Sequence, residues 1–271
     1  MMKAEQARQL ADQQLNRLAE ALAAGQSAAL TAYLAVMARF PRYSFRNQLL
    51  IVSQRPDATR VAGFQTWRKL GRWVRKGEHG IVIVAPLPMR RAEPVDGEDT
   101  DGFLAFRAVH VFDVSQTEGE TLPELSTTQG DPAQHLDQLK ALVAARGINL
   151  RYREDLDGAD GASAGGTVLI RTGLAPAEEF AVLTHELAHE LLHHGVDRAT
   201  TPRRVRELEA EAVAFVVAES VGLDTNNACT DYIQIYQGSV ESLAASLAAV
   251  QQTAATILEA LLPEQARALA A

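Results

Sequence analysis

The run His185-Glu186-Leu187-Ala188-His189 constrains this chain most, because it predicts a helix that carries two metal ligands on one face. Residues four apart lie one turn above each other on a helix, so both imidazoles can reach a single ion. The intervening Glu186 can take a proton from a water at that ion. This H-E-x-x-H pattern is typical of zinc-dependent hydrolases. It predicts His185 and His189 as ligands of zinc (Zn2+) and Glu186 as the general base.

The residues that flank the motif favour a buried helix over a chance match on a solvated one. Pro176, with Glu178 and Glu179 in the first turn, predicts a helix N-terminus. An apolar stripe then follows at helical spacing, made of Phe180, Leu183, Leu187 and Leu191. A buried cluster of histidine and glutamate needs hydrogen-bond partners or a metal. The alternative is a cluster that is solvated or hydrogen-bonded and holds no metal.

A catalytic zinc needs a third protein ligand and one open position. Residues 206–215 predict the next helix, on which Glu207 and Glu211 are four apart and share a face. One of them can bind the metal while the other hydrogen-bonds a ligand histidine, and we favour Glu207 as the ligand and Glu211 as its support. Glu209 is expected on a different face, in solvent. An ordinary acidic helix face is the alternative, and weaker ligand candidates are Asp197, Asp224 and Asp231.

Length and composition predict a cytoplasmic protein of one large or two ordinary domains. The chain has 271 residues, and its hydrophobic content of 47% is ample for packed cores. Its single cysteine, Cys229, excludes an internal disulfide and fits a reducing cytosol. We expect no signal peptide, and no apolar run approaches the length of a membrane span, so no membrane partner is predicted.

The net charge of −8 conceals two parts of opposite sign. Residues 39–91 contain 12 Lys/Arg and 2 Asp/Glu, whereas residues 131–271 contain 10 Lys/Arg and 20 Asp/Glu. The basic part predicts an anionic partner and a domain of its own. Both tryptophans of the chain fall among these cations, which favours single-stranded DNA, because unpaired bases stack on aromatic rings for about 1–3 kcal/mol each. The alternative for each aromatic residue is a place in the core.

The predicted DNA contacts are the cations and tryptophans of this basic stretch. They are Arg42, Arg46, Arg60, Trp67, Arg68, Lys69, Arg72, Trp73, Arg75 and Lys76. In the same region, residues 80–86 predict a buried strand and residues 103–114 its sheet partner, joined by the acidic loop 92–102. We therefore expect the fold class α+β, with a small α+β domain that binds single-stranded DNA followed by a mostly helical domain that carries the zinc ligands.

Three ordered blocks in the first half of the chain carry a family resemblance. They are Tyr43-Ser44-Phe45-Arg46-Asn47-Gln48-Leu49-Leu50, the glycine- and arginine-rich run 62–81, and Val111-Phe112-Asp113-Val114-Ser115-Gln116-Thr117-Glu118-Gly119. These blocks resemble the N-terminal domain of ArdC-type antirestriction proteins, over roughly residues 5–120. The resemblance implies that this domain binds single-stranded DNA. It also implies an antirestriction role, in which incoming plasmid or phage DNA is shielded from host restriction.

The second half carries a resemblance of its own. His185-Glu186-x-x-His189, the following Leu192-His193-His194, and Glu207-x-x-Ala210-Glu211 resemble the gluzincin-type peptidase domain of the ImmA/IrrE and ArdC families. The resemblance implies that Glu207 is the third zinc ligand. Asp231-Tyr232-Ile233-x-x-Tyr236 resembles the closing segment of the family. Side chains near a catalytic zinc can stabilise an oxyanion, and the candidates for that role are Tyr232, Tyr236, His193 and His194.

We therefore predict residues 1–118 as an ArdC-like domain that binds single-stranded DNA, 119–132 as a linker, and 133–271 as a zincin-like metallopeptidase domain acting on a protein substrate. Two other functions fit the same residues. One is a non-catalytic DNA-binding or occlusion module whose zinc fold is structural. The other is an ImmA/IrrE-like regulatory peptidase that cleaves a repressor and has little need of the basic stretch.

Overall fold

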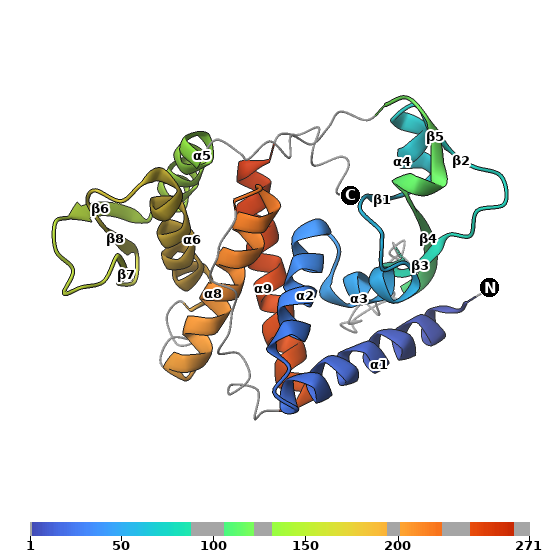
Figure 1. Ribbon diagram of the computed structural model, residues 1–271, viewed down its shortest axis with the longest axis horizontal. Coiled ribbons are helices and arrows are strands. Elements are labelled where there is room, and N and C mark those ends of the chain that lie inside the picture. The colour runs from blue at the N-terminus through green and yellow to red at the C-terminus, as the bar shows by residue number, and fades with distance from the viewer. Residues whose placement is uncertain (1, 88–105, 122–131, 194–200, 224–238, 263–271) are drawn as a thin grey trace, which may run out of the picture. The chain divides into compact units, whose positions relative to one another are not determined.

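The computed structural model describes residues 2–87, 106–121, 132–193, 201–223 and 239–262, and it has the predicted α+β fold class (Figure 1). Packing divides the chain into two compact units. The first joins Met1–Gln14 to Arg46–Glu120, and the second joins Leu15–Phe45 to Thr121–Ala271. Among the described helices, none is both long and apolar enough to cross a membrane.

The first unit is built on two small antiparallel sheets. In the larger sheet, of order β1-β4-β3, β3 pairs with β4 from Ile81 against Val111 to Pro86 against Phe106. This pairing confirms the predicted partner strands, while the predicted loop 92–102 lies outside the described residues. The elements that lie wholly or partly in this unit are α1 (Ala4–Ala23), α3 (Phe45–Gln54), β1 (Val61–Gly63), α4 (Phe64–Lys69), β2 (Arg72–Val74), β3 (Ile81–Pro86), β4 (Phe106–Asp113), η1 (Val114–Gln116) and β5 (Thr117–Gly119). Strand β2 pairs with β5.

Two side-chain amides of α3 cover the outer edge of β3. Asn47 Nδ2 donates to the Val84 carbonyl at 2.9 Å, and the Val84 N–H donates to Asn47 Oδ1 at 3.0 Å. Gln54 makes the same pair of bonds with Val82, at 2.8 and 2.9 Å. Asn47 and Gln54 are about two helical turns apart, so both amides lie on the same face of α3. Val82 and Val84 are two residues apart on one strand, so their backbone groups point to the same edge of the sheet. An edge satisfied in this way does not recruit another strand.

Asp113 ties the end of β4 to the loop that precedes β1. Its buried carboxylate accepts hydrogen bonds from the backbone N–H groups of Thr59 at 2.8 Å, Arg60 at 3.0 Å and Ser115 at 2.9 Å. Gln116 completes the turn, since its Oε1 accepts from the Asp113 N–H at 3.0 Å. The two side chains form a capping box on η1. The Asp-Val-Ser-Gln block of the sequence is therefore a structural element.

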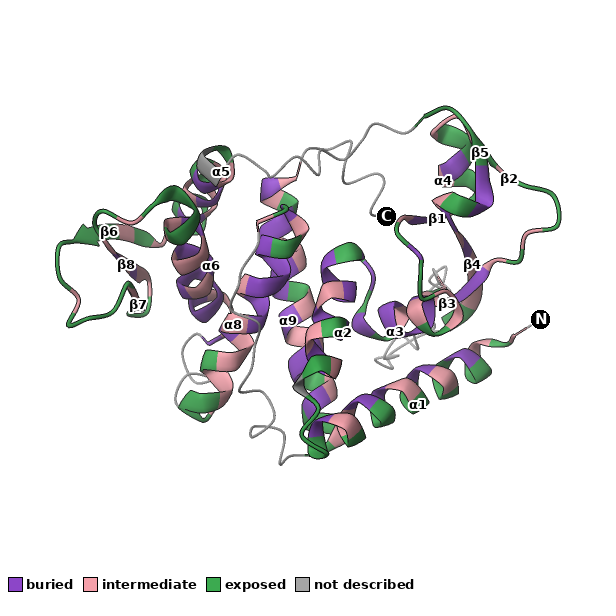
Figure 2. Cartoon of the chain, in the orientation of Figure 1, coloured by how far each residue is buried: buried purple, intermediate pink, exposed green. Residues whose placement is uncertain are grey.

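The second unit packs helices against a small mixed sheet. Its strands are β6 (Asn149–Arg153), β7 (Gly161–Ser163) and β8 (Thr167–Arg171), with β8 central, β6 parallel to it and β7 antiparallel. Its helices are α2 (Ser27–Arg39), α5 (Pro132–Ala145), α6 (Pro176–Leu192), α8 (Arg203–Ser220) and α9 (Val240–Leu261). α6 packs between α5 and α8, and α8 also packs on α9 and α2. Figure 2 shows the buried residues as stripes along α6, α8 and α9.

Division by packing differs from the predicted boundaries chiefly at residues 15–45, which pack with the second unit and not with the remainder of residues 1–118. Ser220 Oγ of α8 donates to the Ala38 carbonyl at 3.0 Å. Gln251 Nε2 of α9 donates to the Pro41 carbonyl at 2.7 Å. In this unit α2 packs on α8, and its apolar residues Leu30, Leu34 and Met37 are completely buried.

Asp113→Asn tests the loop anchor. Burial opposes ionisation, yet the donors from Ser115, Thr59 and Arg60 outweigh it and hold the pKa of Asp113 below its ordinary value. Such a group stabilises the fold above the unfolded pKa of about 3.9, and the contribution is lost as pH falls through the folded-state pKa. Because the amide leaves a donor unpaired, we expect the free energy of unfolding near neutral pH to fall by about 1–3 kcal/mol.

Urea unfolding between about pH 3 and pH 7 measures both the loss and its pH dependence. Asp57→Asn is the control, because the Asp57 side chain is 77% exposed and lies 3.7 Å from Arg55 in an ion pair of little energetic value. Equal stability losses in the two variants would contradict the assigned role of Asp113.

Candidate metal centre

Helix α6 is the predicted motif helix, and its burial positions the two histidines. It begins at Pro176 as predicted, and the Glu178 carboxylate accepts from the Ala175 N–H at 3.1 Å. The apolar stripe is completely buried at Phe180, Leu183 and Leu187. With the stripe packed inward, the motif residues face α8, the next helix of the same unit.

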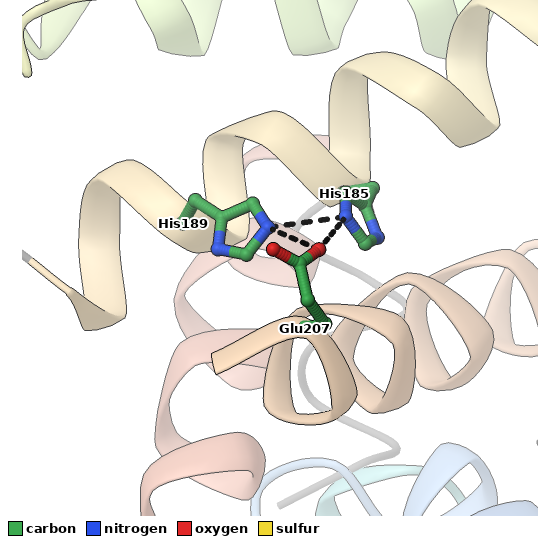
Figure 3. Close-up of side chains that lie close together, drawn as sticks. All are labelled: His185, His189 and Glu207. Carbon is green, nitrogen blue, oxygen red and sulfur yellow. Dashed lines mark hydrogen bonds and ion pairs between the residues drawn. The ribbon is translucent and has the colours of Figure 1, made fainter. Parts of the chain in front are cut away.

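Three side chains from α6 and α8 converge on one point (Figure 3). His185 Nε2 and His189 Nε2 lie 3.1 Å apart. Glu207 Oε2 lies 3.6 Å from His185 Nε2 and 3.3 Å from His189 Nε2. Zinc bonds of about 2.0–2.2 Å place neighbouring ligands of a tetrahedral ion about 3.3–3.6 Å apart. The donor set therefore fits a small divalent ion, and it is the one group of its kind among the described residues.

The protonation states of these side chains suit metal binding. Burial and the neighbouring His185 lower the pKa of His189 to about 4, so its imidazole is neutral at neutral pH. Burial opposes ionisation of Glu207, but His189 and His185 outweigh it and lower the pKa of this carboxyl group. Neutral imidazole and ionised carboxylate are the forms that coordinate metals. For His185, burial is outweighed by Glu211 and Glu186, which raise its pKa, so a proton competes with the metal there.

Glu211 lies where a supporting carboxylate is expected. Its Oε2 is 3.4 Å from His185 Nδ1, on the far side of the ring from the nitrogen that faces Glu207. A carboxylate in this position favours a proton on Nδ1 and leaves the Nε2 lone pair for a metal. The predicted roles of Glu207 and Glu211 fit this geometry, and the bound metal itself stays a prediction.

Glu186 is confined between the ligands and strand β7. It is 8% exposed, and its charge acts on His185. A Cβ added at Gly161 of β7 would lie 2.9 Å from Glu186 Cγ and Oε1, and 2.6 Å from Val182 Cγ1. Glycine at position 161 therefore leaves the space that this carboxylate occupies. A carboxylate held beside the ligand cluster suits the role of a general base.

Glu209 was predicted to be solvated, and this prediction is wrong. Its side chain is 12% exposed, and Oε2 lies 2.9 Å from His193 Nε2. The sequence held a signal for this burial. Glu209 falls in the apolar stripe of α8, three, four and seven residues before buried Ala212, Val213 and Val216.

His193 does not fit the predicted role of oxyanion stabiliser. It is 3% exposed and follows α6, one turn beyond His189. Its Nδ1 lies 3.3 Å from His189 Nδ1, and its Nε2 faces Glu209, so both ring nitrogens are already engaged. The other oxyanion and ligand candidates, Tyr232, Tyr236, His194, Asp197, Asp224 and Asp231, lie outside the described residues.

Glu190 anchors the motif helix to the sheet, although no prediction singled it out. Its Oε1 accepts from Ser163 Oγ at 2.5 Å and from the Gly165 N–H at 2.9 Å, and its Oε2 accepts from the Gly166 N–H at 2.6 Å. Glu190 is buried, one turn after Glu186 on the same helix. An acid at that position of an apolar helix was the available signal, because a buried carboxylate needs partners.

Of the two tryptophans predicted as DNA contacts, only Trp73 is accessible. Trp67 is completely buried, and its Nε1 donates to the Phe112 carbonyl at 2.9 Å, so the prediction that it stacks on DNA is wrong. Its ring fills the core between α4 and β4. Trp73, on β2, is 51% exposed.

The predicted cations differ in how far other groups engage them. Three of them are exposed and form no ion pair with another described residue, namely Arg68, Lys69 and Lys76. Three others interact with neighbouring side chains: Arg46 pairs with Asp12, Arg72 Nε donates to Thr117 Oγ1 at 2.8 Å, and Arg75 pairs with Glu78 at 3.2 Å. Arg60 is half-buried. Arg42 lies in the second unit, 3.9 Å from Glu259, and so does not belong to the basic surface of the first.

Glu207→Gln tests the ligand set. The amide keeps the size of the side chain but removes the charge, so we expect the affinity for Zn2+ or Mn2+ to fall at least about tenfold. Competition with a chromophoric chelator measures the affinity. Glu219→Gln is the matched control, because Glu219 is exposed near the other end of α8. Unchanged affinity in Glu207→Gln would contradict the assignment.

Comparison with known proteins identifies relatives for both halves of the chain. Residues 6–118 match the family described as the N-terminal domain of anti-restriction factor ArdC. An uncharacterized protein of Bacillus anthracis is 26% identical over 275 residues, a match that covers 83% of this chain and 46% of that protein. The chain thus spans about half the length of this curated relative.

Two crystal structures share the fold. The metal-free structure of antirestriction ArdC protein from the R388 plasmid has a TM-score of 0.55 at 18% identity, and the match covers 95% of this chain and 98% of the ArdC chain. The Mn(II)-bound structure has a TM-score of 0.53 at 19% identity, covering 93% and 96%. Residues 6–118 therefore belong to the ArdC N-terminal domain family, and the chain shares the fold of ArdC over most of its length.

Proposed function

We propose that this is an antirestriction protein that binds single-stranded DNA through its first unit and carries a zinc peptidase centre in its second. The observation that carries the enzymatic half is the convergence of His185, His189 and Glu207 at the spacing of tetrahedral metal ligands. The match of residues 6–118 to the ArdC N-terminal domain supports the DNA-binding half.

The surface chemistry of the first unit suits an unpaired strand. Trp73 offers an exposed ring, and a base stacked on such a ring is worth about 1–3 kcal/mol. The exposed cations Arg68, Lys69 and Lys76 neutralise phosphates and make the affinity depend on salt. Duplex DNA keeps its bases stacked on one another, so an exposed tryptophan among cations favours the single strand.

The second unit supplies the residues for hydrolysis of a peptide bond. A bound divalent metal would polarise a carbonyl group and acidify a water. His185 and His189 would hold the ion through Nε2, and Glu207 through its carboxylate. Glu186 would accept the proton of the attacking water and pass it to the leaving amine. We propose zinc as the ion. The Mn(II)-bound ArdC structure supports a divalent metal in general, and nitrogen and oxygen ligands accept either ion.

Protection of DNA by occlusion alone is the second candidate function. The residues proposed for DNA binding belong to one compact unit and the candidate metal ligands to the other, so the two activities can be separable. Occlusion predicts protection that survives loss of Glu186. A regulatory peptidase that cleaves a repressor, by contrast, needs a defined protein substrate and no exposed basic surface.

Trp73→Ala tests the stacking surface. We expect the affinity for a fluorescent single-stranded oligonucleotide to fall about tenfold, in line with the loss of one stacked base. Anisotropy across a salt series measures both the affinity and its salt dependence. Tyr152→Ala is the control, since Tyr152 is 44% exposed but lies in the second unit. The assignment fails if the two variants bind alike, or if wild type does not bind at low salt.

Glu186→Gln tests the proposed base. We expect the variant to keep the wild-type metal affinity and to lose cleavage of an unstructured protein such as casein by at least about a hundredfold. Mass spectrometry of the products and metal titration of the same sample give the two results. Undiminished cleavage by Glu186→Gln would remove its catalytic role. Protection of DNA by this variant in a restriction assay would favour occlusion.

A further inference from the structure

A hydrogen-bonded chain of side chains continues from the candidate metal centre into the core. His189 Nδ1 lies 3.3 Å from His193 Nδ1. His193 Nε2 lies 2.9 Å from Glu209 Oε2, and Ser246 Oγ donates to Glu209 Oε1 at 2.5 Å. The chain thus links α6, α8 and α9. All of its members beyond His189 are nearly or fully buried, with Glu209 the most accessible at 12%.

The directions of these hydrogen bonds are fixed once Glu209 is ionised and His193 is neutral. An ionised Glu209 only accepts, so Ser246 and His193 Nε2 must both donate to it. A neutral His193 that donates through Nε2 has a lone pair on Nδ1. The neighbouring Nδ1 of His189 must then carry the proton that joins the two rings.

The position of this proton decides whether His189 can bind the candidate metal. A neutral histidine carries one ring proton, so a proton on His189 Nδ1 leaves a lone pair on Nε2. That nitrogen lies 3.1 Å from His185 Nε2 and 3.3 Å from Glu207 Oε2. The opposite proton placement would point an N–H group at the position a metal would take. The Nδ1 of His185 faces the carboxylate of Glu211. The Nδ1 of His189 instead faces the imidazole of His193, whose other nitrogen is hydrogen-bonded to the carboxylate of Glu209.

We propose that His193, Glu209 and Ser246 are positioning residues that fix the tautomer of His189 and orient its Nε2 lone pair for the metal. This inference rests on the metal centre of the proposed function. Partners that orient a ligand histidine in this way commonly change metal affinity 10–100-fold. The long chain of partners also explains why Glu209, an acid in an apolar stripe, is buried between three helices.

Two readouts test the proposal on the full-length protein, and neither is catalytic. One is the ring 15N chemical shifts of His189 in the metal-free protein, which report the nitrogen that carries the proton. The other is the affinity for Zn2+, measured by competition with a chromophoric chelator. Either His193→Phe or Glu209→Leu alone leaves an unpaired polar group in the core and can fail to fold. The principal variant is therefore the double substitution His193→Phe/Glu209→Leu, which replaces both polar partners by apolar groups of similar size.

We expect wild-type His189 to carry its proton on Nδ1, and the double variant to shift it toward Nε2 and to bind Zn2+ about 10–100-fold more weakly. Glu209→Gln keeps an oxygen that can accept from His193, so it should retain the tautomer and lose less affinity. Glu219→Gln should match wild type in both readouts.

Unchanged tautomer and Zn2+ affinity in a folded double variant would overturn the proposal. So would a wild-type His189 that carries its proton on Nε2. Absence of Zn2+ binding in wild type would instead count against the metal centre. In that event the tautomer of His189 in wild type and the double variant still decides whether the hydrogen-bonded chain fixes the proton.

Discussion

The packing of α6 on α8 is the contact on which the proposed chemistry depends. Each helix presents a pair of polar residues four apart, and the crossing sets Glu207 against both histidines and Glu211 against one of them. The pairs meet only because the apolar stripes of both helices are buried, from Phe180 on α6 to Val216 on α8. Without a metal, the cluster brings two imidazoles and two carboxylates together in a partly buried site, which is costly unless protons or an ion balance the charges.

The sequence alone predicts the side of each helix on which the candidate ligands lie, because that side is set by the helical period. His185, His189, Glu207 and Glu211 follow from spacing, and they lie together as expected. The burial of Glu209 does not follow from its acidic neighbours, but from the apolar residues three, four and seven positions further along α8. The role of His193 could not be predicted either, since it depends on Glu209 and Ser246, which come from two other helices.

The first unit shows the same limit for long-range contacts. The strands 81–86 and 106–113 were predictable from their apolar runs, and they pair as expected. The sequence does not predict which tryptophan enters the core, because Trp67 and Trp73 are six residues apart in the same basic stretch and differ only in what packs over them. The sequence also does not predict the unit to which α2 belongs, since its apolar side can be buried by either one. Two of the three blocks that resemble ArdC are partly structural, since Asn47 in the first and Asp113 and Gln116 in the third satisfy backbone groups.

The central claim is that a divalent metal binds where α6 crosses α8. Anomalous diffraction from crystals of the protein grown with Zn2+, recorded on both sides of the zinc absorption edge, tests it most directly. The account predicts one strong peak within about 2.0–2.2 Å of His185 Nε2, His189 Nε2 and a Glu207 oxygen. A zinc peak at other residues, or none at this crossing in crystals that contain the ion, would contradict it.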